Sequence, residues 1–510
     1  MNAHEPTGTA SLSAARRERE LGELADGAAV DVLVVGLGAT GAGVALDAAS
    51  RGLSVAAVDA HDLAFGTSRW SSKLIHGGLR YLASGQLAIA HESAVERGVL
   101  MEHTAPHLVQ AQPFVLPVGP LLSRGQAALA WSGLRAGDAL RAAARTSRRT
   151  LPRPRRLSPV ETLRLLPGLR RDGLRQGLLS WDGQVCDDVR LVTALARTAA
   201  AHGARVLTRV RALELGDGGA VVRDELTGTR HEIRARAVVN ATGVWADALV
   251  DGIRLRPSRG THLVLRSEAL GGLSAGVHIP VPGTTGRFAL VLPQHDGRVY
   301  VGLTDEPVDG PVPDEPEAPE ADIGFLLDLL DSALEVPVRR ADVVGAFAGL
   351  RPLLDAAGAS SDISRRHAVL TSRQGVVTVV GGKLTTYRRM AEDAVDTAVA
   401  ARGLDAGPCR TARLPLVGAA PPDALARLDA PRRLVRRYGT EAPAVHALGL
   451  DDPVVPGHSA TLGELVWAVR HEGALDEGDL LDRRTRIGLV PEDRAAALGA
   501  AREALAARVP

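Results

Sequence analysis

The sequence predicts an α/β fold, and the clearest sign is a strand-helix-strand pattern near its start. Val30–Val35 and Leu53–Asp59 are apolar runs of strand length, and a helical pattern over 40–51 separates them. Far downstream, the buried-strand pattern of Val376–Val380 leads through a glycine turn into a helix from about Thr386. Short alternating runs between these two ends add further strands, so we expect mixed sheets with covering helices.

Three glycines join the first strand to its helix. Gly36, Gly38 and Gly41 have the spacing G-x-G-x-x-G. The first permits a tight turn, the second lets a pyrophosphate approach the backbone, and the third allows close packing of helix on strand. Asp59 ends the second strand, where a carboxylate can accept hydrogen bonds from a ribose diol. This combination predicts a dinucleotide site.

Two later segments return to the same kind of position. A strand over 235–240 ends in Ala241, Thr242 and Gly243, and the strand over 376–380 ends in Gly381, Gly382, Lys383, Leu384 and Thr385. A nicotinamide site is usually complete within one continuous domain, whereas these returns suit a longer cofactor. We therefore expect FAD, although each return alone could be an ordinary strand-to-helix turn.

Composition limits the other possibilities. The chain has 510 residues and a formal net charge of +1, which favours several domains and gives no indication of a nucleic-acid partner. Cys186 and Cys409 are its two cysteines, so we expect a reducing compartment, no disulfide framework and no metal site. No long apolar stretch predicts a membrane span, and residues 1–29 suggest a poorly ordered, flexible tail.

Four motifs occur in the order of one known family. Ser71–Leu82 (SSKLIHGGLRYL), Val239–Gly243 (VNATG), Ala348–Leu353 (AGLRPL) and Gly381–Arg388 (GGKLTTYR) resemble signatures of FAD-dependent glycerol-3-phosphate dehydrogenases. The match runs from about residue 30 to 400, and Asp482–Leu489 is similar to the family's C-terminal helical domain. The four motifs together are specific, while any one alone is not.

The resemblance implies three domains. A glycine-oxidase-like, discontinuous Rossmann-type FAD domain would comprise residues 30–115, 180–255 and 340–404. A substrate domain built on an antiparallel sheet would comprise 116–179 and 256–339, and a helical domain 405–510. The implied reaction oxidises sn-glycerol 3-phosphate to dihydroxyacetone phosphate by hydride transfer to flavin N5. The electrons would pass to a quinone of the menaquinone or ubiquinone pool, at the cytoplasmic face of the membrane, and the enzyme could be a homodimer.

Substrate chemistry selects a further set of residues. A phosphate favours arginine, whose planar fork binds two oxygens, and a base must take the hydroxyl proton. Motif context then assigns Arg80, Arg351 and Arg365 to the phosphate, with Tyr81 as a hydroxyl donor. Lys383 follows two glycines and could stabilise the developing alkoxide or the negative charge of the reduced flavin. His262 is the candidate base because imidazole titrates near neutral pH. Arg366 could replace its neighbour Arg365, and His262 could be only a half-buried polar group.

The polar loop over 62–82 would hold the flavin. We expect Thr67, Ser68, Ser72 and Lys73 to contact the phosphates and ribityl chain, His76 to lie near the isoalloxazine, and Trp70 to shield it. Separately, residues 135–156 contain eight arginines and a single acid, Asp138. Such a basic segment could contact anionic headgroups, or it could be a solvated linker.

Three alternatives stay open at this level. An oxidase would keep flavin and substrate but use oxygen. A related oxidoreductase would bind a 2-hydroxy acid or an amino acid, with the arginines on a carboxylate. A degenerate flavoprotein would act only as a partner in RNA modification or assembly, which the presence of Arg351 and Lys383 disfavours.

Overall fold

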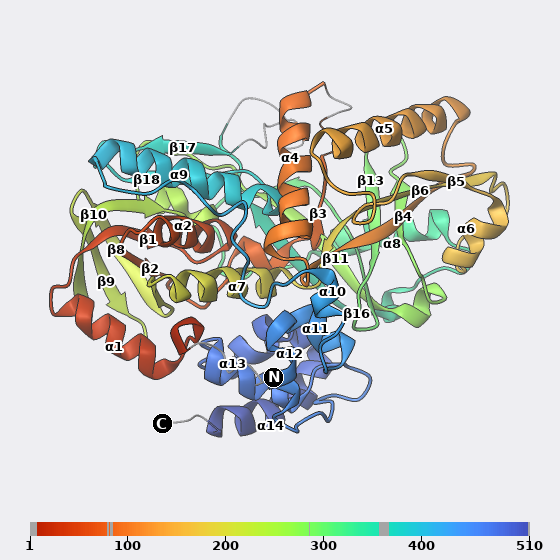
Figure 1. The fold of residues 1–510 in the computed structure, drawn as a ribbon. Coiled ribbons are helices and arrows are strands. Elements are labelled where there is room, and N and C mark those ends of the chain that lie inside the picture. The colour runs from red at the N-terminus through yellow and green to blue at the C-terminus, as the bar shows by residue number, and fades with distance from the viewer. Residues whose placement is uncertain (1–7, 79–80, 82–84, 285, 356–366, 508–510) are drawn as a thin grey trace.

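The computed structural model describes residues 8–78, 81, 85–284, 286–355 and 367–507. Figure 1 shows three lobes: one sheet with its helices on the left, a second sheet on the right, and the C-terminal helices below both. The chain crosses between the two sheets several times, so each sheet is assembled from distant segments.

The first sheet is largely parallel. Its order is β17 (Ala368–Thr371), β18 (Val377–Val380), β10 (Arg230–Asn240), β1 (Val30–Val35), β2 (Val55–Val58) and β7 (Arg205–Leu207). All neighbours pair in parallel except β17, and the hairpin of β8 (Val210–Gly216) and β9 (Gly219–Asp224) joins β10 antiparallel. The expected β-α-β unit and both later strands therefore meet in one sheet.

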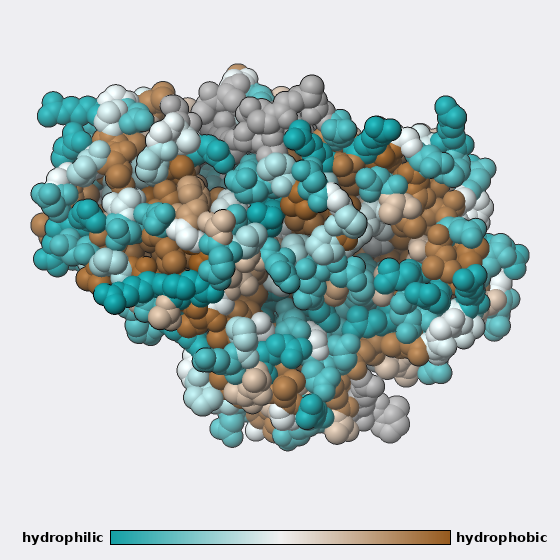
Figure 2. Space-filling model, turned by 180° about the vertical axis from the view of Figure 1, so that it is seen from behind, coloured by the Kyte–Doolittle hydropathy of each residue, from teal (hydrophilic) through white to brown (hydrophobic). Residues whose placement is uncertain are grey.

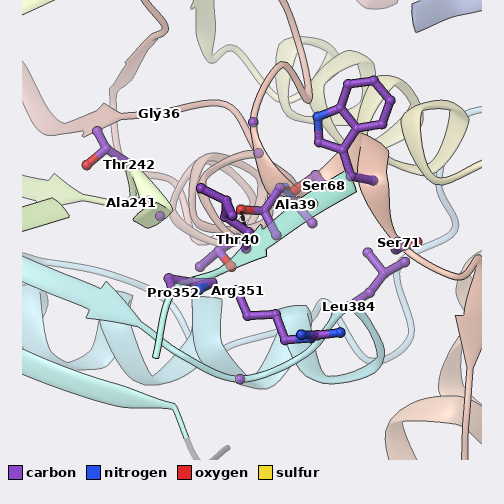
Figure 3. Close-up of a pocket in the computed structure, with 18 of the residues that line it drawn as sticks. Gly36, Ala39, Thr40, Ser68, Ser71, Ala241, Thr242, Arg351, Pro352 and Leu384 are labelled. Atoms are coloured by element: carbon purple, nitrogen blue, oxygen red, sulfur yellow. Dashed lines mark hydrogen bonds between the residues drawn. The ribbon is translucent and has the colours of Figure 1, made fainter. Parts of the chain in front are cut away.

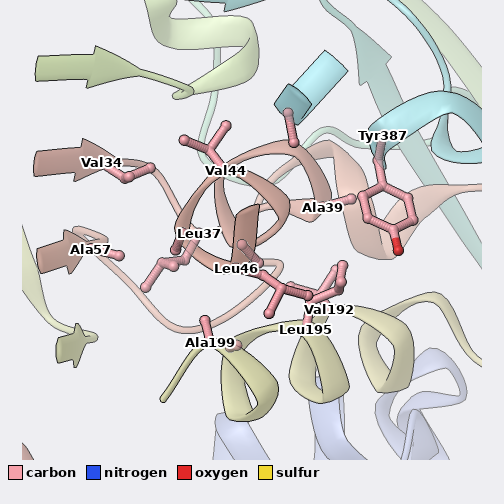
Figure 4. Packing of buried hydrophobic residues seen from close by; sticks show 14 of the residues in the cluster. Val34, Leu37, Ala39, Val44, Leu46, Ala57, Val192, Leu195, Ala199 and Tyr387 are labelled. Atoms are coloured by element: carbon pink, nitrogen blue, oxygen red, sulfur yellow. The ribbon is translucent and has the colours of Figure 1, made fainter. Parts of the chain in front are cut away.

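Helix α2 (Ala39–Ser50) is buried on nearly every side. It packs against α7 (Asp188–Ala201) and α9 (Tyr387–Arg402). In Figure 4, Leu46 of α2 lies against α7 while Val34 of β1 points toward the helix from the sheet. The alanine- and glycine-rich sequence of α2 has little side-chain bulk, which lets two helices and a sheet approach it closely.

The other face of this sheet carries α1 (Ala14–Ala25), where we expected a flexible tail. That expectation is wrong for the described part of the segment. Ser13 caps the helix by accepting from the amide of Arg16, and Leu24 is fully buried against the sheet. Arg17 donates to the carboxylate of Asp224. The polar composition hid two leucines at helical spacing, and their burial against the sheet helps to hold the helix in place.

The second sheet is mainly antiparallel, as expected, with one parallel pair between β12 and β4. Its order is β15 (Glu306–Pro307), β11 (Ser258–Arg266), β14 (Arg298–Gly302), β13 (Phe288–Pro293), β12 (Gly276–Pro280), β4 (Val109–Val118), β6 (Gln176–Val185) and β3 (Leu74–Ile75), with β16 (Val343–Arg351) on β11 and β5 (Arg155–Leu157) on β6.

This pairing moves the expected domain boundaries. We assigned residues up to 115, from 180 and from 340 to the cofactor domain, but β4, β6 and β16 belong to the second sheet. The strands pair along nearly their whole length, so a boundary within β4 or before β16 would break a continuous ladder of backbone hydrogen bonds. Local sequence shows a strand but not its partner.

Helices cover the second sheet from several sides. The structure places α4 (Leu87–Val99), α5 (Arg124–Ala143), α6 (Pro159–Leu165) and α8 (Glu320–Ala333) in this lobe or at its border. On the face shown in Figure 2, hydrophobic residues are interspersed among hydrophilic ones over all three lobes, as is usual for surfaces facing water. Within the described ranges, every helix is too short or too polar to cross a bilayer.

Residues after 405 form the expected helical domain: α10 (Pro422–Leu425), α11 (Arg432–Tyr438), α12 (Ala442–His446), α13 (Leu462–His471) and α14 (Pro491–Ala506). Buried ion pairs tie it to α7, where Arg190 Nη1 lies 2.6 Å from Glu472 and Arg197 Nη1 lies 2.6 Å from Glu441. A buried charge needs a partner, so this interface is specific in register.

Candidate active site

A cavity of about 560 Å³ lies where the two sheets meet. It opens beside the carboxyl ends of β1, β2, β10 and β18, the edge at which open α/β sheets bind ligands. In Figure 3, Gly36 and Thr242 lie on one side of the pocket, and Arg351 and Leu384 on another. Residues from both sheets therefore surround one space.

The three glycines have different roles in the turn after β1. Gly36 has φ +99°, and a Cβ there would lie 2.6 Å from Ala241 O. Gly38 lines the cavity and begins α2 as its N-cap. Gly41 does not line it but packs against the turn, where a Cβ at Gly41 would overlap Gly36 O. Gly41 thus lets α2 pack on β1, and Gly36 and Gly38 leave the backbone open to an anion.

Asp59 lies at the end of β2 and organises the same turn. Its carboxylate accepts from the amide of Leu37 at 2.6 Å and from that of His61 at 2.8 Å. Burial nevertheless raises the pKa of Asp59 to about 6. It lines the cavity, where it can accept from ribose hydroxyls when ionised.

Thr67, Ser68 and Ser72 line the cavity, and each hydroxyl also has a protein partner. Thr67 donates to Leu350 O at 2.7 Å, and Ser68 accepts from the amide of Ala39 at 2.9 Å. Ser72 Oγ is 2.8 Å from His262 Nε2. These bonds fix the loop over the start of α2 and against the second sheet.

Lys73 is not at the cavity, contrary to our prediction. Its side chain is 2% exposed, and Nζ lies 2.7 Å from Asp188 at the start of α7. The backbone at Lys73 is left-handed, with φ +58°, so the side chain turns away from the wall formed by its neighbours. Burial lowers the pKa of Lys73 to about 8, although Asp188 opposes the shift.

The strand ends after β10 and β18 complete the wall. Ala241, Thr242 and Gly243 line it, and buried Asn240 holds Thr242 by accepting from its hydroxyl at 2.7 Å. Gly381, Gly382, Lys383, Leu384 and Thr385 line it from the other side.

Distant loops meet directly at this wall. The amide of His76 donates to Thr385 Oγ1 at 3.1 Å, across 309 positions of sequence. Lys383 Nζ lies 3.7 Å from the centre of the Tyr81 ring, an attractive cation–π arrangement. Tyr81 is buried behind Lys383 and does not line the cavity. It therefore orients the ammonium group.

His262 reaches the cavity from β11. Its ring stacks on Phe347 at 4.8 Å, and a side chain at Gly302 would collide with it. Burial, together with the charges of Lys73 and Arg351, lowers the pKa of His262 to about 3. The imidazole is therefore neutral near pH 7, the form that can accept a proton.

Arg351 ends β16 and projects into the same cavity. Nη1 donates to Asp305 at 3.0 Å and to Ser258 Oγ at 3.1 Å, while Nη2 donates to Thr304 O at 3.1 Å. Sequence reasoning missed Asp305, which holds the guanidinium in place, and no local signal marked it. The predicted residues Arg80 and Arg365 lie outside the described residues.

Comparisons with known proteins agree over the whole length. Residues 31–388 match the FAD-dependent oxidoreductase family, and 409–509 match the C-terminal domain of alpha-glycerophosphate oxidase. The chain is 52% identical to glycerol-3-phosphate dehydrogenase 1 of Mycobacterium tuberculosis, covering 98% of this chain and 99% of that protein.

The chain belongs to the FAD-dependent glycerol-3-phosphate dehydrogenase family. The crystal structure of the Bacillus halodurans glycerol-3-phosphate dehydrogenase complexed with FAD is similar, with a TM-score of 0.73 and 28% identity over 97% of this chain and 94% of that chain. Glycine oxidase of Bacillus cereus shares the fold, with a TM-score of 0.50 and 19% identity over 73% of this chain and 95% of that one.

FAD is the cofactor of this family member, and the residues of the cavity fit it. The Gly36–Gly38 turn is free of side chains where an anion must approach backbone amides, and Asp59 stands where a ribose is expected. Ser72, His76 and Lys383 lie along the same cavity toward the second sheet. The fit rests on shape and donor chemistry together.

Proposed function

We propose that this chain oxidises sn-glycerol 3-phosphate to dihydroxyacetone phosphate and passes the electrons to a quinone. The observation that carries the proposal is the meeting of Arg351, His262 and Lys383 on one cavity that also contains the dinucleotide turn. A phosphate anchor, a proton acceptor and a cation for a developing alkoxide are the protein groups that this oxidation needs. Relatives bearing the name glycerol-3-phosphate dehydrogenase support the same substrate.

Bound FAD supplies the acceptor for the hydride that leaves C2 of the substrate. Arg351 binds the phosphate in our proposal. Asp305 and Ser258 hold its guanidinium in place on one side. An arginine already fixed in place loses little rotamer freedom on binding, so little conformational entropy is lost when it binds the phosphate. Binding the phosphate at this point also positions C2 of the substrate against the hydride acceptor.

His262 accepts the hydroxyl proton. His262 Nε2 already makes a hydrogen bond with Ser72 Oγ. The substrate hydroxyl therefore either displaces Ser72 and transfers its proton directly to Nε2, or passes the proton to Nε2 through the Ser72 hydroxyl. The charge of Arg351 contributes to the low pKa of His262. A phosphate dianion on Arg351 offsets that charge, so substrate binding itself makes His262 a stronger base.

Lys383 stabilises the negative charge that develops on the substrate oxygen. The face of Tyr81 supports its ammonium, and the turn after β18 brings it to the cavity. A cation held in place before the reaction stabilises the transition state without reorganisation.

The test is anaerobic stopped-flow absorbance of the FAD-loaded protein mixed with sn-glycerol 3-phosphate. Rapid bleaching of the oxidised flavin band is expected, and 2-hydroxyglutarate should leave it unchanged. A flavin that bleaches with 2-hydroxyglutarate instead would overturn the substrate assignment.

A second experiment identifies the electron acceptor. The C-terminal match to an oxidase domain keeps oxygen as the alternative to a quinone. After bleaching, a soluble menaquinone analogue should restore the oxidised band faster than air-saturated buffer. Faster return in oxygen, with peroxide formed, would assign an oxidase.

We also propose peripheral contact with the cytoplasmic membrane face through residues 135–156. Arg141 is buried and bonded to Asp138, so it is structural, whereas Arg156 is exposed and lies 4.9 Å from the Trp131 ring. Arg145, Arg148 and Arg149 are exposed, and each charge near an anionic surface contributes about 1 kcal/mol. Co-sedimentation with phosphatidylglycerol vesicles should fall in high salt and in the triple glutamine variant; unchanged sedimentation would refute this role.

A further inference from the structure

A buried ionic cluster lies directly behind the cavity wall formed by Trp70, Ser71 and Ser72. Its members are Lys73, Asp188 and Arg486, and their relative exposures are 1%, 0% and 3%. None of the three lines the cavity. Burying three charged side chains is costly unless their hydrogen bonds compensate. The groups that these side chains bind therefore show what the cluster stabilises.

Lys73 and Asp188 hold the wall through its backbone. Lys73 Nζ donates to Arg69 O at 3.0 Å as well as to Asp188. Asp188 in turn accepts from the Ser71 amide at 3.1 Å and from its hydroxyl at 2.8 Å. The carbonyl and amide groups just before Ser72 are therefore fixed from behind.

Arg486 reaches the same point from the C-terminal domain. Nη2 donates to Arg69 O at 2.6 Å, so this carbonyl accepts from two cations. Its guanidinium carbon also lies 5.2 Å from the Trp70 ring. The backbone at Arg486 has φ +61°, and Arg298 supports it by donating to Arg486 O at 2.7 Å. The helical domain thus contacts the flavin loop itself.

The fixed wall determines where Ser72 stands. Trp70 has little freedom, because a Cβ at Gly349 would lie 2.5 Å from Trp70 Cβ. Ser72 Oγ bonds to His262 Nε2 at 2.8 Å on β11 of the second sheet. A small shift of residues 69–73 would break this bond and move the cavity wall, while Arg351 has separate supports at Asp305 and Ser258.

We propose that Lys73, Asp188 and Arg486 are positioning residues, a buried clamp through which α7 and the C-terminal domain set the flavin-side wall and the Ser72–His262 pair. The predicted effect on the rate of flavin reduction rests on the proposed function. The predicted effects on FAD affinity and flavin dichroism require only that the chain binds FAD. The clamp gives the C-terminal domain a role in the active site besides stability.

The test compares Arg486→Met, Arg486→Lys and the double variant Lys73→Met/Asp188→Asn with Arg197→Met as the matched control. Arg197 also joins α7 to the C-terminal domain through a buried pair, with Glu441, but its hydrogen bonds go to Ala10 and Glu441 and not to residues 69–73. The double variant leaves no unpaired buried charge at these two positions, so it should fold even if a single change does not.

The clamp variants should reduce flavin with glycerol 3-phosphate about 100-fold more slowly, since small misplacements have effects of that size. The apparent substrate dissociation constant should change less than threefold, because Arg351 is untouched. Arg486→Lys keeps the charge and should recover part of the rate. Arg197→Met should lower the melting temperature and leave the rate of the folded enzyme within threefold.

Two readouts do not depend on the substrate. The dissociation constant for FAD should rise about tenfold in the clamp variants, and the visible circular dichroism of bound flavin should change. If wild type does not bleach with glycerol 3-phosphate, the proposed function fails while these readouts still test the clamp. Folded clamp variants with wild-type FAD affinity and flavin dichroism would overturn it, as would a control that loses rate equally.

Discussion

Replacing Arg351 by alanine should weaken substrate binding and leave FAD bound. The guanidinium can offer a phosphate two charge-assisted hydrogen bonds, each worth about 1.5–3 kcal/mol. These values are already net of the bonds to water, so the loss is at least about 3–4 kcal/mol, which corresponds to a 100- to 1000-fold rise in KM. The hydrogen bonds of Arg351 to Ser258, Asp305 and Thr304 do not involve the glycine turn, so the flavin content should not change.

Asp305 complicates the single variant. Its side chain is 8% exposed, and it loses its guanidinium partner when Arg351 is removed. The carboxylate left behind would repel phosphate and exaggerate the effect. Arg351→Ala/Asp305→Asn removes this repulsion, so its KM should lie about tenfold below that of the single variant and still well above wild type.

The assay measures flavin content by absorbance and KM by steady-state turnover with a quinone analogue. Loss of flavin from Arg351→Ala would show that Arg351 supports the cofactor and not the substrate. A KM within fivefold of wild type in both variants would refute the phosphate assignment.

Three more outcomes follow from local geometry. Gly41→Ala should lower stability by about 1–3 kcal/mol and abolish FAD retention, because its Cβ would overlap Gly36 O. Gly22→Ala is the control and should do neither, because a Cβ there has nothing within 4 Å. Equal flavin content in both variants would contradict the packing role of Gly41. Ionised Asp59 accepts from ribose hydroxyls, and its pKa of about 6 is raised, so it becomes protonated as pH falls through 6. The dissociation constant for FAD should therefore rise about tenfold from pH 7 to pH 5, and Asp59→Asn should remove this dependence; a parallel slope in both would exclude Asp59. Leu24→Ala should cost about 2–5 kcal/mol in denaturant unfolding, whereas an unchanged midpoint would mean that α1 adds no stability.

Local patterns predicted those parts of the site that depend on local structure. The glycine turn, Asp59 and the small residues after β10 and β18 follow from strand and helix periodicity, and they line one cavity. Arg351 came from the family resemblance and His262 from the chemistry of imidazole, and the structure brings both to that cavity.

The failures concern side-chain direction and strand partners. Lys73 stands between two residues that line the cavity, but its left-handed backbone turns it toward Asp188, 115 positions away. A sequence gives no measure of that backbone angle for a lysine. Likewise β16 reads as a strand in either sheet, and only its pairing with β11 places it. Long-range pairing decided both cases.

The parallel sheet has a consequence for biosynthesis. β1 pairs with β10, and β10 pairs with β18, so the wall of the cavity is incomplete until residues 377–380 have joined the sheet. At roughly 10 residues per second, translation separates the first and last of these strands by about half a minute. During that interval, the nascent glycine turn lacks the partners that shape it. FAD must therefore bind late in synthesis. A chain that is truncated midway contains the G-x-G-x-x-G turn but has no complete FAD site.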